Sequence, residues 1–173
     1  MRKLVIDRAA IKNNLTVIKD RAAGAAIYGV VTGDGQGVGA AALAQLLRDE
    51  GIGRFAVSEV SEAEALRQAG FVDEEILMLR STTDREVLER LVDLNVVCTI
   101  SSVDTGLALN ALAENRSTVA EAHIQVDTGM GFGGFLVGEP EKILLAYRSL
   151  PNVALSGIYT QLHAVSPKGP EVG

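Results

Sequence analysis

Tryptophan is absent from this sequence, cysteine occurs once and aromatic residues are scarce, and each shortage excludes a class of protein. The single Cys98 rules out an internal disulfide framework, which is typical of a protein of the reducing cytoplasm. Because aromatic residues make up only 4% of the chain, stacking platforms for bases or sugars would be hard to build. The composition favours a small polar ligand instead.

Clusters of basic residues and long apolar runs are missing as well. The net charge is −6, and lysines and arginines are spread along helical patterns rather than gathered in one segment. No apolar run reaches the roughly 18 residues of a membrane span, and none resembles a secretory signal. We therefore expect neither a nucleic acid nor a membrane as a partner.

The chain does contain a regular alternation of short apolar runs with helical patterns. Its 173 residues, 47% of them hydrophobic, suffice for one globular domain over residues 1–173. Apolar residues recur at helical spacing from Ala10 to Arg21, and the near-continuous apolar runs between such patterns predict buried parallel strands. The predicted strands are Ile27–Val31, Phe55–Val57, Ile76–Leu79, Val96–Ile100, His123–Val126 and Val153–Tyr159.

Polar residues mark where several of the helices should begin. A Ser, Thr or Asp before a helical pattern offers an oxygen to the first N–H groups of the helix, and a Glu three residues later completes a capping box. The predicted caps are Asp7, Ser61 with Glu64, Thr83 with Glu86, and Ser102, and Pro140 is expected in a first turn. These signals support the alternation independently of the apolar runs.

Ile27 to Gly39, IYGVVTGDGQGVG, is the stretch where we expect a ligand. A predicted strand ends near Thr32, and glycines at 33, 35, 37 and 39 lead into the next helical pattern. At the carboxyl end of a strand in an α/β protein, backbone amides can face a ligand and glycines allow its close approach. A second glycine-rich stretch, DTGMGFGGF, follows the fifth predicted strand.

Other constellations point to structure rather than chemistry. GDGQGVG lacks the G-x-G-x-x-G register of a dinucleotide site, and no lysine follows it as in a P-loop. His123 and His163 have no Cys, His or acidic partner at ligand spacing, so no metal site is expected. Ser101 and Ser102 are typical of helix caps, and Cys98 is typical of a small core residue.

Four segments, in the same order, resemble the N-terminal barrel domain of alanine racemases and the related fold-type III pyridoxal-phosphate (PLP) enzymes. The segments are Val5–Leu15 (VIDRAAIKNNL), Val30–Gly39 (VVTGDGQGVG), Val126–Phe135 (VDTGMGFGGF) and the GIYTQLHA stretch from Gly157. From the first segment to the last, they span nearly the whole length of the chain. The resemblance implies an α/β fold, a parallel (β/α) TIM-barrel-like domain, with PLP as cofactor and amino-acid racemisation, an isomerase reaction, as the activity of the family.

The barrel that the resemblance implies is expected to be incomplete. Periodicity alone fits a (β/α) barrel and an open doubly wound sheet equally well. A barrel needs eight strands and about 250 residues, whereas about six strands are predicted here and the family's C-terminal β-domain is absent. We favour a fragment of a longer protein over a barrel that closes by association or a degenerate open barrel.

Departures from the family pattern bear on the chemistry. Thr32 stands where the family has the lysine that forms the Schiff base with PLP, and a hydroxyl can neither form an imine nor exchange the substrate proton near neutral pH. Gln36 stands at a tyrosine position near the cofactor phosphate, Phe132 at an arginine position near the cofactor ring, and Gln161 at a histidine position. The candidates for cofactor contacts are Asp34, Gln36, Gly37, Phe132 and Gln161.

Two functions remain open. The first is a racemase-like domain of the PLP family without racemase activity, in which Thr32 occupies a non-functional catalytic position. The second is a non-catalytic binding or partner subunit on the same barrel, which binds a small amino acid or a phosphate-bearing ligand. Such a chain is expected to form a homo-oligomer or to pair with a related subunit. An artificial replacement at position 32 is a third explanation of the missing lysine.

Overall fold

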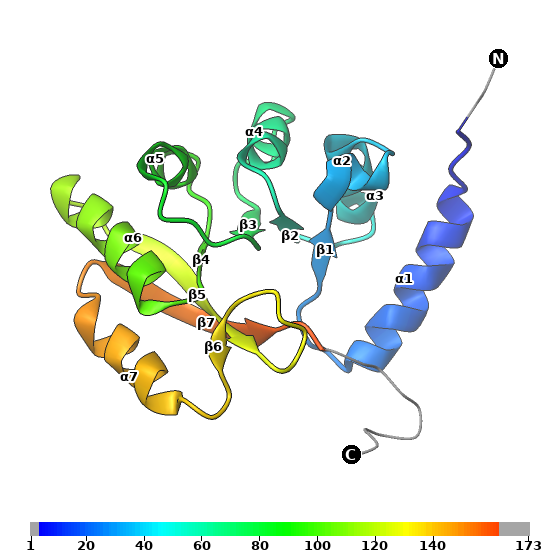
Figure 1. Cartoon of the computed structure of the whole chain (residues 1–173). Helices are drawn as coiled ribbons and strands as arrows, with labels where there is room; N and C mark the ends of the chain where they lie inside the picture. Colours follow the sequence, from blue (N-terminus) through cyan, green and yellow to red (C-terminus); the bar gives the residue numbers. More distant parts are fainter. Residues whose placement is uncertain (1–3, 163–173) are drawn as a thin grey trace. The chain divides into compact units, whose positions relative to one another are not determined.

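The computed structural model describes residues 4–162, and these divide into two compact units. Unit 1 is the chain up to Arg80 together with Asp93–Val96, and unit 2 is Ser81–Val92 together with the chain from Val97 onward. Parallel strands alternate with helices in each unit (Figure 1). His163 lies outside the described residues. Within them, no helix is both long and apolar enough to cross a bilayer.

Unit 1 contains a parallel three-stranded sheet in the order β1-β2-β3. Gly29, Phe55 and Ile76 are partners across the three strands, and Phe55 and Ile76 are fully buried. The ring of Phe71 lies edge-on to Phe55 with centroids 5.3 Å apart, a geometry that aromatic quadrupoles favour. The elements are α1 (Arg8–Ala22), β1 (Tyr28–Val30), α2 (Thr32–Gln36), α3 (Ala40–Asp49), β2 (Arg54–Val57), α4 (Val60–Gln68) and β3 (Glu75–Met78).

The first helix makes a narrower apolar contact than its sequence pattern predicts. Leu15 is the buried residue of α1, whereas Ile18 remains 48% exposed. Polar contacts add to this attachment: Arg8 pairs with Asp49 at 2.8 Å, and Lys19 donates to the carbonyl oxygen of Glu50. Because exposed ion pairs contribute little stability, α1 depends mainly on the burial of Leu15.

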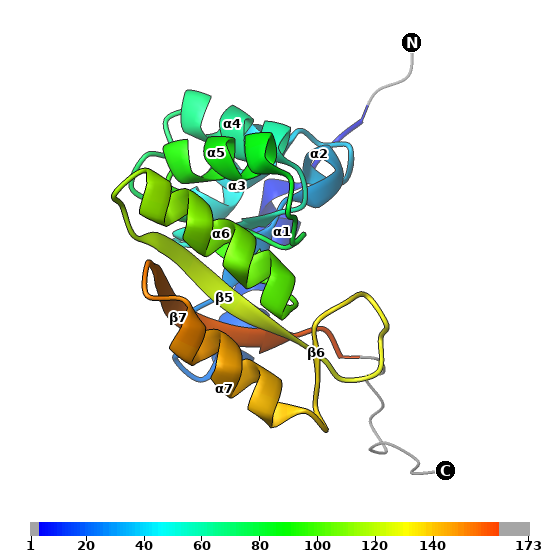
Figure 2. The ribbon, with the colours of Figure 1, turned by 60° about the vertical axis from the view of Figure 1, so that its left-hand side comes forward.

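Unit 2 is organised around β5, which pairs in parallel with β4, β6 and β7. The strand β6 was not predicted, because two residues carry no periodicity. Helices α6 and α7 lie side by side against this sheet (Figures 1 and 2). The elements are most of α5 (Arg85–Asp93), β4 (Cys98–Ile100), α6 (Val103–Asn115), β5 (Ala120–Asp127), β6 (Phe135–Leu136), α7 (Pro140–Ser149) and β7 (Val153–Thr160).

Three of the predicted helix starts are confirmed. The side chain of Asp7 accepts the N–H groups of Ala9 and Ala10 at 2.8 and 3.2 Å. The hydroxyl of Ser102 accepts the N–H of Thr105 at 3.2 Å. Pro140 occupies the first turn of α7, where its missing N–H costs nothing. These starts depend on neighbours in the sequence, so the local pattern was sufficient.

The two predicted capping boxes are wrong by one or two residues. Helix α4 begins at Val60, so Ser61 lies inside the helix instead of capping it. The capping box at this helix start is formed by Glu59 and Glu62 instead. The N–H groups of Ser58 and Glu59 donate to the carboxylate of Glu62. In α5, Asp84 rather than Thr83 is the cap, since its carboxylate accepts the N–H groups of Glu86 and Val87 at 2.9 and 3.2 Å.

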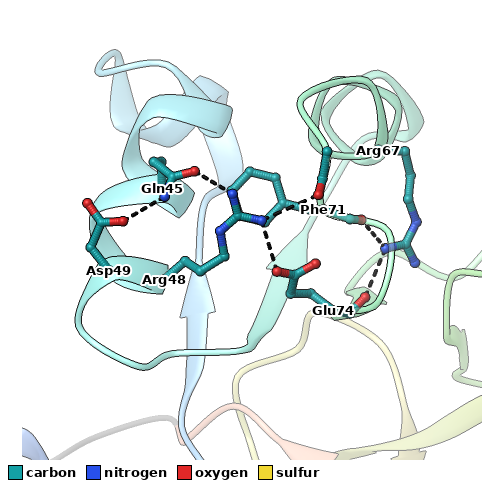
Figure 3. A network of polar contacts seen from close by, with 7 residues as sticks. Gln45, Arg48, Asp49, Arg67, Phe71 and Glu74 are labelled. Carbon is teal, nitrogen blue, oxygen red and sulfur yellow. Dashed lines mark hydrogen bonds and ion pairs between the residues drawn. The ribbon is translucent and has the colours of Figure 1, made fainter.

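Arg67, at the end of α4, bonds to the segment that leads to β3 (Figure 3) and to a second, separate segment of unit 1. Its guanidinium donates to the carbonyl oxygens of Phe71 and Glu74 on the way to β3. The same group donates to the carbonyl oxygens of Leu94 and Asn95, both at 2.8 Å. Burial lowers the pKa of Arg67 and the charge of Glu74 opposes this, and four carbonyl acceptors compensate the buried charge.

Arg48 forms a second bridge beside Arg67 (Figure 3). It donates to Glu74 at 3.0 Å and to Gln45 at 2.6 Å. Its guanidinium also lies over the ring of Phe71, 4.1 Å from the centroid. Arginine rather than lysine suits both bridges, because the planar fork serves several acceptors at fixed angles and can stack on a ring.

The loop between β5 and β6 returns close to β5 at Gly134. This residue has φ of 120°, and a Cβ there would lie 2.8 Å from the backbone nitrogen of Asp127 and 2.9 Å from the carbonyl oxygen of Gln125. Gly133 also has positive φ, at 93°, but a Cβ there would meet nothing within 4 Å. A side chain at position 133 would therefore cause backbone strain alone, whereas one at position 134 would cause both strain and a steric collision.

Gly134→Ala is expected to destabilise unit 2 more than Gly133→Ala. Both substitutions place alanine at positive φ, at a cost of about 1–2 kcal/mol. Only the methyl group at 134 also collides with the backbone of β5, which is held by its strand partners. Chemical denaturation of each variant gives the difference in free energy of unfolding. Equal losses for the two variants would contradict the close approach at Gly134.

Arg67→Met is expected to lower the free energy of unfolding by about 2–4 kcal/mol, because four carbonyl groups lose a charged donor. Arg85→Met is the matched control: Arg85 is exposed and pairs with Glu89 at 2.9 Å, so its loss should cost about 0.5 kcal/mol or less. Urea denaturation measures both. A loss for Arg67→Met as small as that of the control would show that water replaces the guanidinium.

Candidate functional site

The stretch α2 is a left-handed turn rather than a right-handed helix. The backbone φ angles are 62° at Gly33, 52° at Asp34, 62° at Gly35, 56° at Gln36 and 85° at Gly37. Glycine adopts these angles readily, and Asp tolerates them better than most residues, whereas Gln36 is strained. The glycines of this loop are therefore required by a specific backbone conformation at the carboxyl end of β1.

Most amides of this loop already donate to acceptors of the protein. Gly35 donates to the carbonyl of Val31 at 2.9 Å, which closes the turn. Gly39 donates to the carbonyl of Asp34 at 2.8 Å, and Ala40 donates to Asp34 Oδ1 at 2.9 Å. A phosphate could use these amides only by displacing their acceptors. In this conformation the loop is not an amide cradle for an anion.

The loop holds four of the residues singled out from the sequence. Thr32 is half-buried at the end of β1 and begins the turn. Asp34, although exposed, uses one carboxylate oxygen to fasten the start of α3. Gln36 and Gly37 are exposed at the far end of the turn. Of these four residues, Thr32 is thus the one whose side chain is partly shielded from water.

Glu62, in the first turn of α4, is a buried carboxylate that touches the loop. It is 8% exposed. Its Oε1 accepts the N–H of Asp34 at 3.1 Å, and its Oε2 accepts the N–H groups of Ser58 at 2.9 Å and Glu59 at 3.1 Å. One side chain therefore connects the loop after β1 with the backbone at the end of β2.

The pKa of Glu62 shows which influence prevails at this position. Burial is the largest single cause and raises the pKa, but the N–H groups of Ser58, Asp34 and Glu59 together outweigh it, so the pKa is lowered. The carboxylate is therefore charged at neutral pH.

Sequence analysis missed Glu62 because the segment SEAE was interpreted as a capping box between Ser61 and Glu64. The signal that was available is Glu59 followed three residues later by Glu62, which also fits a capping box.

Glu59 and Arg80 form an ion pair at the same edge of unit 1. Glu59 follows β2 and Arg80 lies just after β3, and the two side chains are 54% and 66% exposed. Because water screens such a pair, its contribution to stability is small. Arg80 is a cationic group at a strand end that sequence analysis did not single out.

In unit 2, Asp127 shapes the loop that follows β5. Its Oδ1 accepts the N–H groups of Gly129 and Gly131 at 2.8 and 3.1 Å, an Asx-type turn. The bond from Gly131 is the largest cause that lowers the pKa of Asp127, and the bond from Gly129 is the next. Asp127 is therefore an acceptor for its own loop and stays ionised at neutral pH.

Four hydroxyl groups of unit 2 form two pairs. Thr128 and Thr160 are 2.8 Å apart, and Thr128 also donates to the carbonyl of Gln161 at 3.3 Å. Ser81 and Ser101 form a second pair at 2.5 Å. Each hydroxyl pairs with another hydroxyl, so neither pair contains a base that could activate a nucleophile.

Phe132 and Gln161 lie at the same edge of unit 2. Phe132, in the loop after β5, is 67% exposed, and Gln161, after β7, is exposed. The contact between Thr128 and the backbone of Gln161 connects these two segments. The two residues offer a phenyl ring and an amide, neither of which is charged.

Two further groups of unit 2 belong to the core. The thiol of Cys98 is buried in β4, and burial raises its pKa to about 12, so a reactive thiolate is not available at neutral pH. This confirms Cys98 as a core residue. The hydroxyl of Tyr159 lies 3.0 Å from that of Thr99, and burial raises the pKa of Tyr159 although this bond opposes the shift. Among residues 4–162, no three His, Cys, Asp or Glu side chains are grouped as metal ligands would be.

Comparison with known proteins identifies the family. The profile described as "Alanine racemase, N-terminal domain" matches residues 6–170. An alanine racemase of Clostridium tetani is 34% identical over 157 residues, which are 90% of this chain and 40% of that protein. The chain therefore spans about 40% of the length of such relatives.

Solved structures agree with this match. An alanine racemase of Clostridium difficile in complex with cycloserine superposes with a TM-score of 0.78 at 30% identity, over 86% of this chain and 41% of that one. An alanine racemase of E. faecalis superposes with a TM-score of 0.77 at 31% identity, over 91% and 43%. The parallel strands that alternate with helices thus confirm the predicted fold class, an incomplete (β/α) barrel. The chain belongs to the alanine racemase N-terminal domain family.

Proposed function

We propose that this chain is a racemase-type barrel domain without the covalent PLP chemistry of amino-acid racemases. The observation that carries the proposal is Thr32, which offers a hydroxyl at the carboxyl end of β1 where the resemblance requires an amine. Among the described residues, lysines occur on α1 (Lys12 and Lys19) and on α7 (Lys142). No described lysine therefore stands at the carboxyl end of a strand.

The other residues predicted to contact the cofactor, in the loops after β1 and after β5, do not fit a covalently held PLP either. The amides of Gly39 and Ala40 are engaged by Asp34, so they are not open to the cofactor phosphate. Gln36 has an amide in place of a phenol, and Phe132 cannot supply a positive charge near a pyridine ring. We therefore assign no proton transfer to these side chains.

The remaining parts of the proposal concern the protein as a whole. Residues 1–173 form one alanine-racemase-like domain of a cytoplasmic protein, and alanine racemisation belongs to the longer relatives. Its ligand is a small amino acid or a phosphate-bearing compound. The acidic net charge of −6 and the exposed pair of Glu59 and Arg80 favour a ligand that carries both charges over a simple anion.

A second candidate function is a non-catalytic partner subunit on the same barrel. Strand β7 pairs with β5, the one strand partner that the described residues give it. Its Ile158 is 63% exposed, and Leu144 and Tyr147 of α7 are 53% and 67% exposed. A strand at the edge of a sheet, with exposed apolar residues beside it, is a surface that pairs readily with another chain. This observation favours self-association or pairing with a related subunit.

Thr32→Lys tests the first function. Wild-type protein treated with PLP and borohydride is expected to carry no adduct at position 32 and to leave the α-proton of alanine unexchanged, because a hydroxyl forms no imine. In Thr32→Lys, the new amine is half-buried, which lowers its pKa and increases its reactivity. It should be labelled in preference to the lysines of α1 and α7, as peptide mapping by mass spectrometry will show.

Thr83→Lys is the control for this experiment, since it places the same amine at an exposed position of unit 2. Equal labelling at 32 and 83 would mean that the loop gives no advantage to an amine, and would favour the partner function. Exchange of the α-proton of alanine by the wild-type chain would contradict the first proposal outright.

Light scattering tests the second function. If β7 mediates association, the wild-type chain should exceed the mass of a monomer, and Ile158→Lys should shift it towards the monomer because a charge then lies on the contact surface. Val72→Lys is the control, since Val72 is 66% exposed in unit 1. A wild-type monomer at all concentrations would rule out self-association, and an equal effect of both variants would rule out β7 as its site.

A further inference from the structure

The left-handed turn at Gly33–Gly37 is held only in part by bonds within its own loop. A left-handed conformation costs an L-residue about 1–2 kcal/mol, and two non-glycine residues, Asp34 and Gln36, adopt it here. Within the loop, the N–H groups of Gly35, Gly37, Val38 and Gly39 donate to backbone carbonyls at 2.8 to 3.2 Å. At about 1 kcal/mol each, these bonds offset much of the strain, but none of them holds the N–H of Asp34 in the middle of the turn.

Glu62 provides support from a different part of unit 1. Its Oε1 accepts the N–H of Asp34, which lies in the middle of the strained turn and 28 residues away in sequence. Bonds between N–H groups and a buried carboxylate are stronger than neutral ones. The bond fixes the peptide that joins Gly33 to Asp34, and the N–H of Gly33, in the peptide joined to Thr32, also faces this carboxylate.

Capping of α4 alone does not account for Glu62. Its Oε2 already serves the N–H groups of Ser58 and Glu59, which is what a glutamate at this helix position ordinarily does. An exposed side chain could do the same without the cost of burying a charge. Oε1 is the additional acceptor, and it is directed at the loop rather than at the helix.

We propose that Glu62 is a positioning residue of the glycine loop, whose carboxylate holds the left-handed turn and so sets the direction of the side chain at position 32. The inference goes beyond the proposed function, because it holds whether the group at position 32 is a hydroxyl or an amine. Other charged groups near this carboxylate are Asp34, whose Oδ1 is bonded to Ala40, and the exposed pair of Glu59 and Arg80.

The test compares Glu62→Gln with Glu59→Gln in the full chain. Both remove one negative charge from the start of α4, but only Glu62 touches the loop. Amide exchange at Asp34 is expected to accelerate about ten- to hundredfold in Glu62→Gln, the change that follows from losing one bond to a charged group. Exchange in β2 and β3 should stay unchanged, and Glu59→Gln should leave the Asp34 amide protected.

Wild-type protein gives a second readout that does not depend on a variant folding. A carboxyl group with a lowered pKa loses its stabilising bonds only as the pH falls through that lowered value. The amide resonance of Asp34 should therefore move in acid, below the usual titration range of a glutamate. This transition should be absent in Glu62→Gln and present in Glu59→Gln, which separates it from titration of Asp34 itself.

Two results would overturn the inference. One is an Asp34 amide that keeps its protection in Glu62→Gln while the Ser58 and Glu59 amides lose theirs, which would restrict Glu62 to capping its own helix. The other is an Asp34 resonance in the wild type that shows no acid transition dependent on Glu62. If Glu62→Gln does not fold, Asp34→Asn removes the carboxyl group of residue 34, so an acid transition of the amide at position 34 that persists in this variant supports the role of Glu62, and its loss there overturns it.

Discussion

Each backbone N–H group withdrawn from water needs an acceptor, and this requirement governs the strand ends of both units. At the end of β1, the acceptors are the carboxylates of Glu62 and Asp34. At the end of β5, the acceptor is Asp127, which takes two N–H groups of its own loop. Positive φ angles in both loops make glycine necessary, and buried or turn-forming carboxylates supply the negative charge that holds the amides in place.

The backbone of the glycine loop is held without help from the side chain at position 32. The turn depends on glycines, on Asp34 and on Glu62, and none of these contacts involves the side chain of Thr32. A substitution at position 32 therefore alters the chemistry of the loop and leaves its backbone support intact.

The sequence predicted those features that depend on near neighbours. The caps at Asp7 and Ser102 are local, as is the first-turn position of Pro140, and all three are confirmed. The boxes assigned to Ser61 and Thr83 were wrong, because the residue at which a helix begins depends on where the preceding strand ends. The contacts of Arg67 with segments more than twenty residues away left no pattern that could be recognised beforehand.

By itself, the sequence determined the alternation of strands and helices, the family resemblance and the absence of an amine at position 32, since these follow from residue identity and spacing. Only the tertiary structure decided that the glycine loop is a left-handed turn whose amides are already engaged. The physical reason is that a turn of several glycines has many allowed conformations. The one adopted here places the N–H of Asp34 3.1 Å from Glu62, an acceptor 28 residues away on α4 that no local pattern connects with the loop.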